Sequence, residues 1–295
     1  MPKMNEPIVI ERPGALTDFV AEAENSHWLA LDTEFVRDRH YYPQAGLIQV
    51  GMPGKTALVD PVELTDLSAL KNLLCATGMT KILHAGRQDM ELFLLLFDAV
   101  PHPLYDTQVA AAMTGMAPQV GYAALAEELL QEPPGIALGR YNWLKRPLAA
   151  KAIGYAATDV EHLARLREVL DERLDEAGKR GEFEAAMRDM ENPEHYRPQP
   201  ERAWKRIRQA RRLGSQPRER LKHLAAWRER QAMEENRPRQ WVLRDGVLVT
   251  LARLAPGSAE DLAAVRDLDA PERRRYGPAL LETLAAVPAM EERGD

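Results

Sequence analysis

Residues 27–36 read His-Trp-Leu-Ala-Leu-Asp-Thr-Glu-Phe-Val, an apolar run that holds two acids one residue apart. Side chains alternate between the faces of a β-strand, so Asp32 and Glu34 point to the same face if this stretch is a strand. Two adjacent carboxylates beside an apolar core repel each other and lose hydration, and a divalent cation would relieve both penalties. The other interpretation is a strand end at the surface, where water solvates both acids.

Short apolar runs and helical patterns alternate around this stretch. Runs at 47–52 and 56–59 end in Pro53-Gly54 and Asp60-Pro61, and further short runs lie at 81–84 and 104–106. Leucines at helical spacing cover 64–74, a helix follows the run at 81–84, and one long helix is expected from about 148 to 177. The order βββαβαβ, followed by helices, predicts an α/β domain with a mixed sheet flanked by helices.

The composition is that of a soluble globular chain of about two domains, with 295 residues of which 45% are hydrophobic and 28% charged. The single cysteine, Cys75, excludes an intramolecular disulfide and a cysteine-based zinc site, which suits the cytoplasm. The first 14 residues lack the apolar core of a signal peptide, and no run approaches the length of a membrane-spanning helix. We therefore expect no association with a membrane.

The net charge of −6 is unevenly distributed along the chain. Residues 197–222 hold ten basic and only two acidic side chains, so this stretch is either a solvated connector or a segment that attracts nucleic-acid phosphates. Small helical patterns follow it up to residue 287, among them one that begins at Ser258 as N-cap. We predict domains at 1–191 and 213–295, joined by a basic linker at 192–212.

Two further acids extend the candidate site. Asp159 follows Tyr155 by four residues, which places both on one face of a helix. Asp89 falls in the first turn of the helix after residue 84, where an acid also serves the helix dipole. Each has a structural alternative, a surface acid or a capping acid. Together with Asp32 and Glu34, however, four carboxylates can hold two divalent metals, and hard oxygen ligands suit Mg²⁺ or Mn²⁺.

The motifs around these acids resemble ribonuclease D, in the tyrosine-containing branch of the DEDD superfamily of 3′–5′ exonucleases. The resemblance covers roughly residues 5–185 and rests on five functional positions in order, in the segments 32–37, 41–49, 83–89, 106–108, 143–148 and 155–159. It implies a ribonuclease H-like fold. It also implies that Asp32, Glu34, Asp89 and Asp159 bind two metals, and that Tyr155 orients the attacking water.

The C-terminal region resembles the helicase-and-RNase-D C-terminal (HRDC) domain, a small all-α domain. Arg253-Leu254-Ala255-Pro256 and Arg275-Tyr276-Gly277 carry this likeness. Two departures concern the substrate: there is room for one such domain where some family members carry two, and the segment 135–142 is short and lacks an expected lysine.

The resemblance implies a 3′–5′ exoribonuclease that releases nucleoside 5′-monophosphates from RNA with a single-stranded 3′ end, such as tRNA precursors; we expect no protein partner. The alternatives are an exonuclease acting mainly on DNA and an inactive RNA-binding scaffold. Contacts with RNA are expected in the aromatic and basic segment 37–42 and in the basic stretch, although Phe35 and His84 have structural alternatives in the core and the segment 37–42 has one as a solvated loop. The expected RNA-binding residues are Phe35, Arg37, Tyr41, Tyr42, His84, Arg206, Arg208, Arg211 and Arg212.

Overall fold

The computed structural model describes residues 6–132, 138 and 141–288, which form two compact units. The first unit comprises the described residues up to Val36 together with Pro43–Arg197. The second unit comprises the short segment Arg37–Tyr42 and the described residues from Pro198 onward. Among all described residues, none of the helices combines the length and apolar character needed to cross a membrane.

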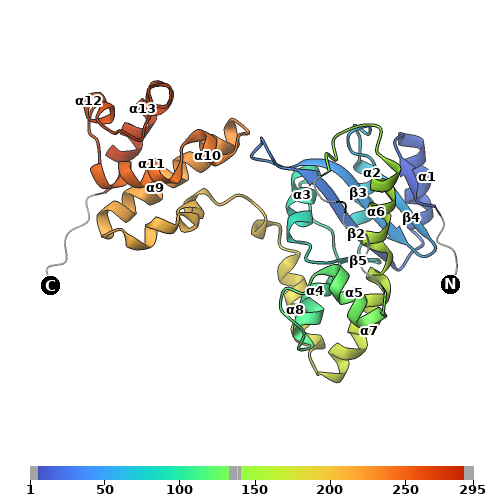
Figure 1. The fold of residues 1–295 in the computed structure, drawn as a ribbon. Coiled ribbons are helices and arrows are strands. Elements are labelled where there is room, and N and C mark those ends of the chain that lie inside the picture. The colour runs from blue at the N-terminus through green and yellow to red at the C-terminus, as the bar shows by residue number, and fades with distance from the viewer. Residues whose placement is uncertain (1–5, 133–137, 139–140, 289–295) are drawn as a thin grey trace. The chain divides into compact units, whose positions relative to one another are not determined.

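One mixed sheet organises the first unit (Figure 1). Its spatial order is β1-β4-β3-β2-β5-β6, and its strands are β1 (Ile8–Ile10), β2 (Trp28–Val36), β3 (Gln44–Met52), β4 (Lys55–Val59), β5 (Thr80–Leu83) and β6 (Leu104–Asp106). Strands β2, β3 and β4 pair antiparallel in sequence, whereas β1, β5 and β6 join as parallel neighbours. The predicted mixed sheet is confirmed.

Helices cover both faces of this sheet. They are α1 (Pro13–Ala23), α2 (Ser68–Leu74), α3 (Arg87–Phe97), α4 (Thr107–Met113), α5 (Tyr122–Leu130), α6 (Ala150–Glu161), α7 (Leu163–Glu176) and α8 (Arg180–Met190), with a 3₁₀ turn η1 (Pro193–His195). Helix α6 crosses β2, β3 and β4 on one face, where Leu47 and Leu58 pack against Ala152 and Ala156. The neighbouring residues Ile48 and Val59 face the larger core on the other side.

The first strand and the first helix are not evident from the amino-acid pattern. Strand β1 has only three residues, which is too short for an alternating pattern to be recognised. Its register is set by parallel pairing with β4, in which Val9 lies opposite Leu58. Helix α1 follows at once, with Pro13 at its first turn and Leu16, Phe19 and Val20 buried.

The long helix expected over 148–177 is two helices that meet at His162. A straight helix would bond the amide of His162 to the carbonyl of Thr158. Instead, the Tyr122 hydroxyl donates to that carbonyl at 3.0 Å and accepts from that amide at 3.2 Å. A side chain inserted into the hydrogen-bond ladder breaks a helix, and this one comes from a distant part of the chain.

The second unit is helical. It contains the 3₁₀ segments η2 (Pro200–Arg206) and η3 (Arg208–Arg212) and the helices α9 (Ser215–Glu234), α10 (Arg239–Val242), α11 (Asp245–Leu254), α12 (Ala259–Ala263) and α13 (Ala270–Ala285). Ser258 caps α12 as predicted, in a capping box with Asp261. Gly277-Pro278 in the sequence suggests a helix that starts only at residue 279, but helix α13 begins at Ala270 and continues through Pro278. Burial of Tyr276 and Leu280 outweighs the local breaker.

The boundaries differ from the predicted linker at 192–212. The segment from Pro200 onward lies in the core of the second unit through four buried side chains at three- and four-residue spacing, Ala203, Ile207, Ala210 and Leu213. The arginines between them are exposed. A stretch rich in arginine and proline looks like a linker because the few apolar residues that anchor it lie among many charged residues.

Candidate active site

Strand β2 positions the first two acids. Asp32 lies opposite Gln49 and Glu34 lies opposite Leu47 in the antiparallel pairing with β3. Residues paired in this way share a face of the sheet. Because Leu47 packs beneath α6, Asp32 and Glu34 both belong to the face that α6 covers. The alternation predicted from sequence therefore holds.

Helix α6 brings Tyr155 and Asp159 to the same face. The two residues are one helical turn apart, and the helix is held to the sheet by Ala152, Ala156 and Val160. Val160 packs directly on Gly51 of β3, because a Cβ at position 51 would lie 3.4 Å from its side chain. One carboxylate oxygen of Asp159, Oδ2, is buried without a hydrogen-bond partner.

The fourth acid, Asp89, enters from the edge of β2. Strand β5 pairs with β2 only as far as Ala30, so the rest of β2 extends beyond it, and the first turn of α3 lies there. Asp89 is buried, and the Thr33 hydroxyl donates a hydrogen bond to its Oδ1. The acids thus come from β2, α3 and α6, three separate parts of the chain.

Asp106 supports this arrangement, a role that the sequence analysis did not assign. Its buried carboxylate accepts the amides of Ala85 and Gly86, at 3.2 and 2.9 Å, in the turn before α3. It also caps α4 through the amides of Gln108 and Val109. Ala85 has a φ of +54°, a left-handed conformation that local sequence does not favour and that these bonds hold in place. An aspartate just before a helix was the available signal.

Burial raises the pKa of every acid in the site, and repulsion by the neighbouring site acids raises those of Asp32 and Glu34 further. Burial is the largest cause for each of them. The pKa of Asp32 lies well above its ordinary value, raised further by Asp89 and Asp159. The pKa values of Glu34, Asp159 and Asp89 rise to about 8, about 7 and about 6. The charges of Asp89 and Asp159 act on both Asp32 and Glu34, so the four carboxylates lie within one electrostatic cluster.

The tyrosine of the site remains protonated. Burial raises the pKa of Tyr155 above its ordinary value, and the negative charges of Asp159, Glu34 and Asp32 raise it further. Its hydroxyl is therefore a hydrogen-bond donor at any pH near neutrality.

A cavity of about 480 Å³ opens beside these groups, lined among others by Asp32, His84, Tyr122, Tyr155, Asp159 and His162. Both ring nitrogens of His84 have partners, the Thr107 hydroxyl at 2.9 Å and the Val120 carbonyl at 3.0 Å. His84 therefore lines the cavity and also has a structural role, whereas its contact with RNA stays a prediction.

The residues expected to bind RNA are distributed over both units. Phe35 is half-buried and follows a register shift in β2, whereas Arg37 begins the segment that belongs to the second unit. In that unit the Tyr41 hydroxyl donates to Glu229 at 2.6 Å, and the Tyr42 amide donates to Asn236. Arg206 lies 3.6 Å from Glu229, and the side chains of Arg208, Arg211 and Arg212 are exposed. The expected short segment 135–142 lies largely outside the described residues.

Comparison with known proteins gives the same assignment for both units. Residues 7–175 match the 3′-5′ exonuclease family, and residues 218–284 match the HRDC domain. The ribonuclease D of Acidiphilium cryptum is 38% identical over 296 residues, which is 99% of this chain and 74% of that protein. The ribonuclease D of Pseudomonas paraeruginosa is 39% identical over 276 residues, 94% of this chain and 73% of that protein.

A solved structure agrees with these relatives. The crystal structure of Escherichia coli RNase D, described as an exoribonuclease involved in structured RNA processing, matches with a TM-score of 0.85 at 35% identity. The match covers 98% of this chain and 76% of that one. The mixed sheet and the appended helical unit are therefore shared along nearly the whole chain. The chain belongs to the ribonuclease D family of divalent-metal-dependent 3′–5′ exoribonucleases.

Proposed function

We propose that this enzyme hydrolyses the last phosphodiester bond at the 3′ end of RNA and releases nucleoside 5′-monophosphates. The observation that carries the proposal is the convergence of four carboxylates, two of which, Asp32 and Asp159, line one cavity together with the protonated Tyr155. We further propose that Asp32, Glu34, Asp89 and Asp159 hold two divalent cations, Mg²⁺ or Mn²⁺. Such ions, when bound, lower the pKa of the attacking water and stabilise the leaving oxygen.

The chemistry of the donors fits these cations. All four side chains offer oxygen ligands, which Mg²⁺ and Mn²⁺ prefer, and the buried Oδ2 of Asp159 has no protein partner. Within residues 6–132, 138 and 141–288, no group of three or more acidic, histidine or cysteine side chains is arranged so that it could hold a metal ion by itself. Magnesium usually keeps several waters and shares substrate phosphates, so we expect water and the scissile phosphate to complete the coordination.

The residues of the chain have separate tasks in this proposal. The carboxylates bind and orient the scissile end. The Tyr155 hydroxyl, which stays protonated, donates a hydrogen bond that orients the attacking water rather than accepting its proton. The cavity beside the acids accepts the 3′-terminal nucleotide.

The proposed substrates are structured RNAs with a free single-stranded 3′ end, such as tRNA precursors, in the cytoplasm. The similarity to E. coli RNase D, an exoribonuclease involved in structured RNA processing, supports this class. The exposed arginines of η3 support it as well, since phosphate contacts supply most of the sequence-independent affinity for nucleic acids.

The test is a time course with 5′-labelled RNA that has a 3′ overhang, in Mg²⁺, Mn²⁺ or EDTA, beside the Asp32→Asn protein and a DNA strand of the same sequence. A metal-dependent ladder that shortens from the 3′ end, faster on RNA and absent in the variant, is the expected result. Faster loss of DNA would favour the DNA exonuclease. Binding without shortening under any metal would favour the scaffold.

Metal removal should make stability depend on pH. The folded pKa values of Glu34, Asp159 and Asp89 lie above the ordinary values near 4 of the unfolded chain. A raised folded pKa adds stability that is complete below the unfolded pKa and is lost as the pH rises through the folded pKa. We therefore expect the melting temperature in EDTA to fall between pH 5 and pH 8.5, and Mg²⁺ to remove most of that fall.

The control for this prediction is a pair of isosteric variants. Asp159→Asn should flatten the pH dependence in EDTA, whereas Asp18→Asn, at an exposed position of α1, should leave it unchanged. A melting temperature that rises with pH in EDTA would contradict the clustering of the acids.

The arginines of η3 should contribute to RNA affinity through charge alone. Replacing Arg208, Arg211 and Arg212 by Gln should weaken binding of structured RNA and reduce the slope of log K against log salt by about 2, because each phosphate contact contributes roughly 0.7–0.9. Cleavage of very short strands should change little. The matched control replaces three exposed arginines elsewhere in the second unit, Arg253, Arg266 and Arg274. Equal slopes for the two triple variants would refute a specific role for η3.

A further inference from the structure

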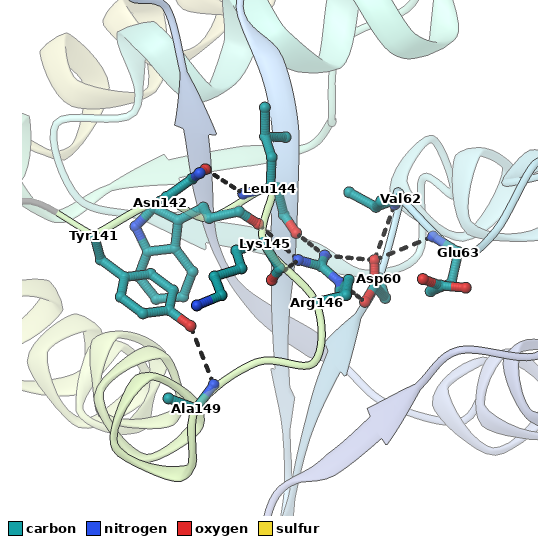
Figure 2. Close-up of polar contacts among 11 residues, drawn as sticks. Asp60, Val62, Glu63, Tyr141, Asn142, Leu144, Lys145, Arg146 and Ala149 are labelled. Atoms are coloured by element: carbon teal, nitrogen blue, oxygen red, sulfur yellow. Dashed lines mark hydrogen bonds and ion pairs between the residues drawn. The ribbon is translucent and has the colours of Figure 1, made fainter.

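A buried ion pair joins the sheet to the segment that leads into α6 (Figure 2). The Arg146 guanidinium donates to both carboxylate oxygens of Asp60, and the bond from Nη2 to Oδ1 measures 2.6 Å. The Asp60 side chain is 0% exposed and that of Arg146 is 14% exposed. Asp60 follows directly after β4 and also accepts the amide of Val62 at 2.9 Å. The position after β4 and the bond from the Val62 amide thus both hold the carboxylate that binds the arginine.

The same guanidinium also binds carbonyl groups on two other segments. It donates to Gly46 at the start of β3 and to Trp143, both at 2.7 Å, and to Lys145 at 3.0 Å. Arg146 therefore ties β3, the end of β4 and the 143–146 loop together through one planar group. Lysine could not replace it, since an ammonium group lacks this fork of donors.

These contacts of Arg146, called the Arg146 clamp below, fix the position of Trp143. A Cβ at position 46 would lie 2.5 Å from the Cβ of Trp143, so Gly46 is needed for the approach that Arg146 stabilises. Trp143 is 5% exposed, and its ring centre lies 6.3 Å from that of Tyr155 at an interplanar angle of 37°. The indole therefore supports the ring of the catalytic tyrosine from within the core.

The same loop also fixes the start of α6. The Tyr141 ring meets Trp143 edge-on at 4.8 Å, and its hydroxyl accepts the amide of Ala149, the residue that precedes the helix (Figure 2). Helix α6 carries both Tyr155 and Asp159. The loop from Tyr141 to Ala149 thus sets where the helix begins and what lies behind its tyrosine.

We propose that Arg146, held by Asp60, is a positioning residue that acts through Trp143 on the hydroxyl of Tyr155. This inference rests on the proposed role of Tyr155 in orienting water. A displacement of about 1 Å in a catalytic group can cost roughly 10²-fold in rate. A clamp that stabilised only the fold would alter the melting temperature and leave the turnover of folded enzyme unchanged.

The first measurement compares Arg146→Lys with Arg180→Lys in steady-state cleavage of a short single-stranded RNA. Arg180 on α8 is a matched control, because its guanidinium also binds carboxylates through several nitrogens. Its partners are Asp171 and Asp175 on α7. We expect Arg146→Lys to lower kcat by about 10-fold or more with KM within about 3-fold. Arg180→Lys should keep the kcat of the parent. A kcat unchanged in folded Arg146→Lys protein would overturn the inference.

The deciding measurement places Arg146→Lys in a Tyr155→Phe background. If Arg146 acts through the phenol hydroxyl, the double variant should have a kcat within about 2-fold of that of Tyr155→Phe alone, because removal of the hydroxyl has already caused the loss in kcat. If the loss in kcat of the double variant equals the product of the two single losses, Arg146 acts by another route and the inference is refuted.

A second variant covers the case in which Arg146→Lys does not fold. Trp143→Phe keeps an aromatic ring in the core but shortens the support behind Tyr155, so it should lower kcat and be masked by Tyr155→Phe in the same way. The proposed function can fail separately: the parent enzyme would then not shorten RNA under any metal. If the parent enzyme is active and the losses multiply, only the positioning role fails.

Discussion

Asp32→Asn should reduce turnover of RNA by about 10⁴-fold while leaving the metal-free protein as stable as the parent or more stable. The loss follows because a carboxylate that binds catalytic metal contributes several kcal/mol to the transition state, and each ~1.36 kcal/mol is tenfold in rate. The stability follows because burial and the neighbouring acids raise the pKa of Asp32, so its charge opposes folding at neutral pH. Single-turnover cleavage in saturating Mg²⁺ and melting in EDTA measure the two effects.

The opposite directions of the two effects make this prediction specific. A variant that misfolded would lose activity and stability together, whereas removal of a repelling acid loses activity alone. Asp159→Asn should behave in the same way, since its carboxylate is also buried with a raised pKa and an unpartnered oxygen. Pure Asp32→Asn protein that kept a tenth of the parent's turnover would contradict the assignment of Asp32 to the metal site.

Tyr155→Phe should lower kcat by about 10²-fold with little change in the affinity for RNA. The variant removes one hydroxyl and keeps the ring against Trp143, so the apolar packing of α6 is retained. Orientation of a reacting water by a positioned side chain contributes roughly 10²–10⁴-fold. Single-turnover cleavage and equilibrium binding in Ca²⁺ or EDTA separate the two quantities.

The matched control for the tyrosine is Tyr196→Phe. Its hydroxyl donates to the Met190 carbonyl at 2.6 Å, in the same unit but not in the cavity of the acids. This variant should keep the kcat of the parent. If Tyr155→Phe turned over RNA at the parent rate, or lost RNA affinity to the same extent as rate, the water-orienting role would be untenable.

The parts of the site that sequence could predict depend on local periodicity. Alternation along a strand placed Asp32 and Glu34 on one face, and a four-residue spacing placed Tyr155 and Asp159 on one side of a helix. These relations hold whatever the rest of the chain does, because they follow from the geometry of a single element. The mixed sheet was predictable from the order of the short apolar runs and helical patterns along the chain.

Other features depended on contacts between distant residues. The break at His162 is made by the hydroxyl of Tyr122, 40 residues away in the sequence. The three-residue strand β1 acquires its register from β4, and the segment predicted as a linker is held in the second unit by four small or branched side chains among its arginines. No local pattern encodes such partners.

The amino-acid sequence by itself determined the five catalytic candidates, their order and the face on which each pair lies. Only the tertiary structure decided that β2, α3 and α6 bring the acids into one cluster, and that Asp60 and Arg146 anchor the loop behind Tyr155. The physical reason is that periodicity is a property of one element, whereas burial, repulsion and a bidentate ion pair require groups from separate elements to meet.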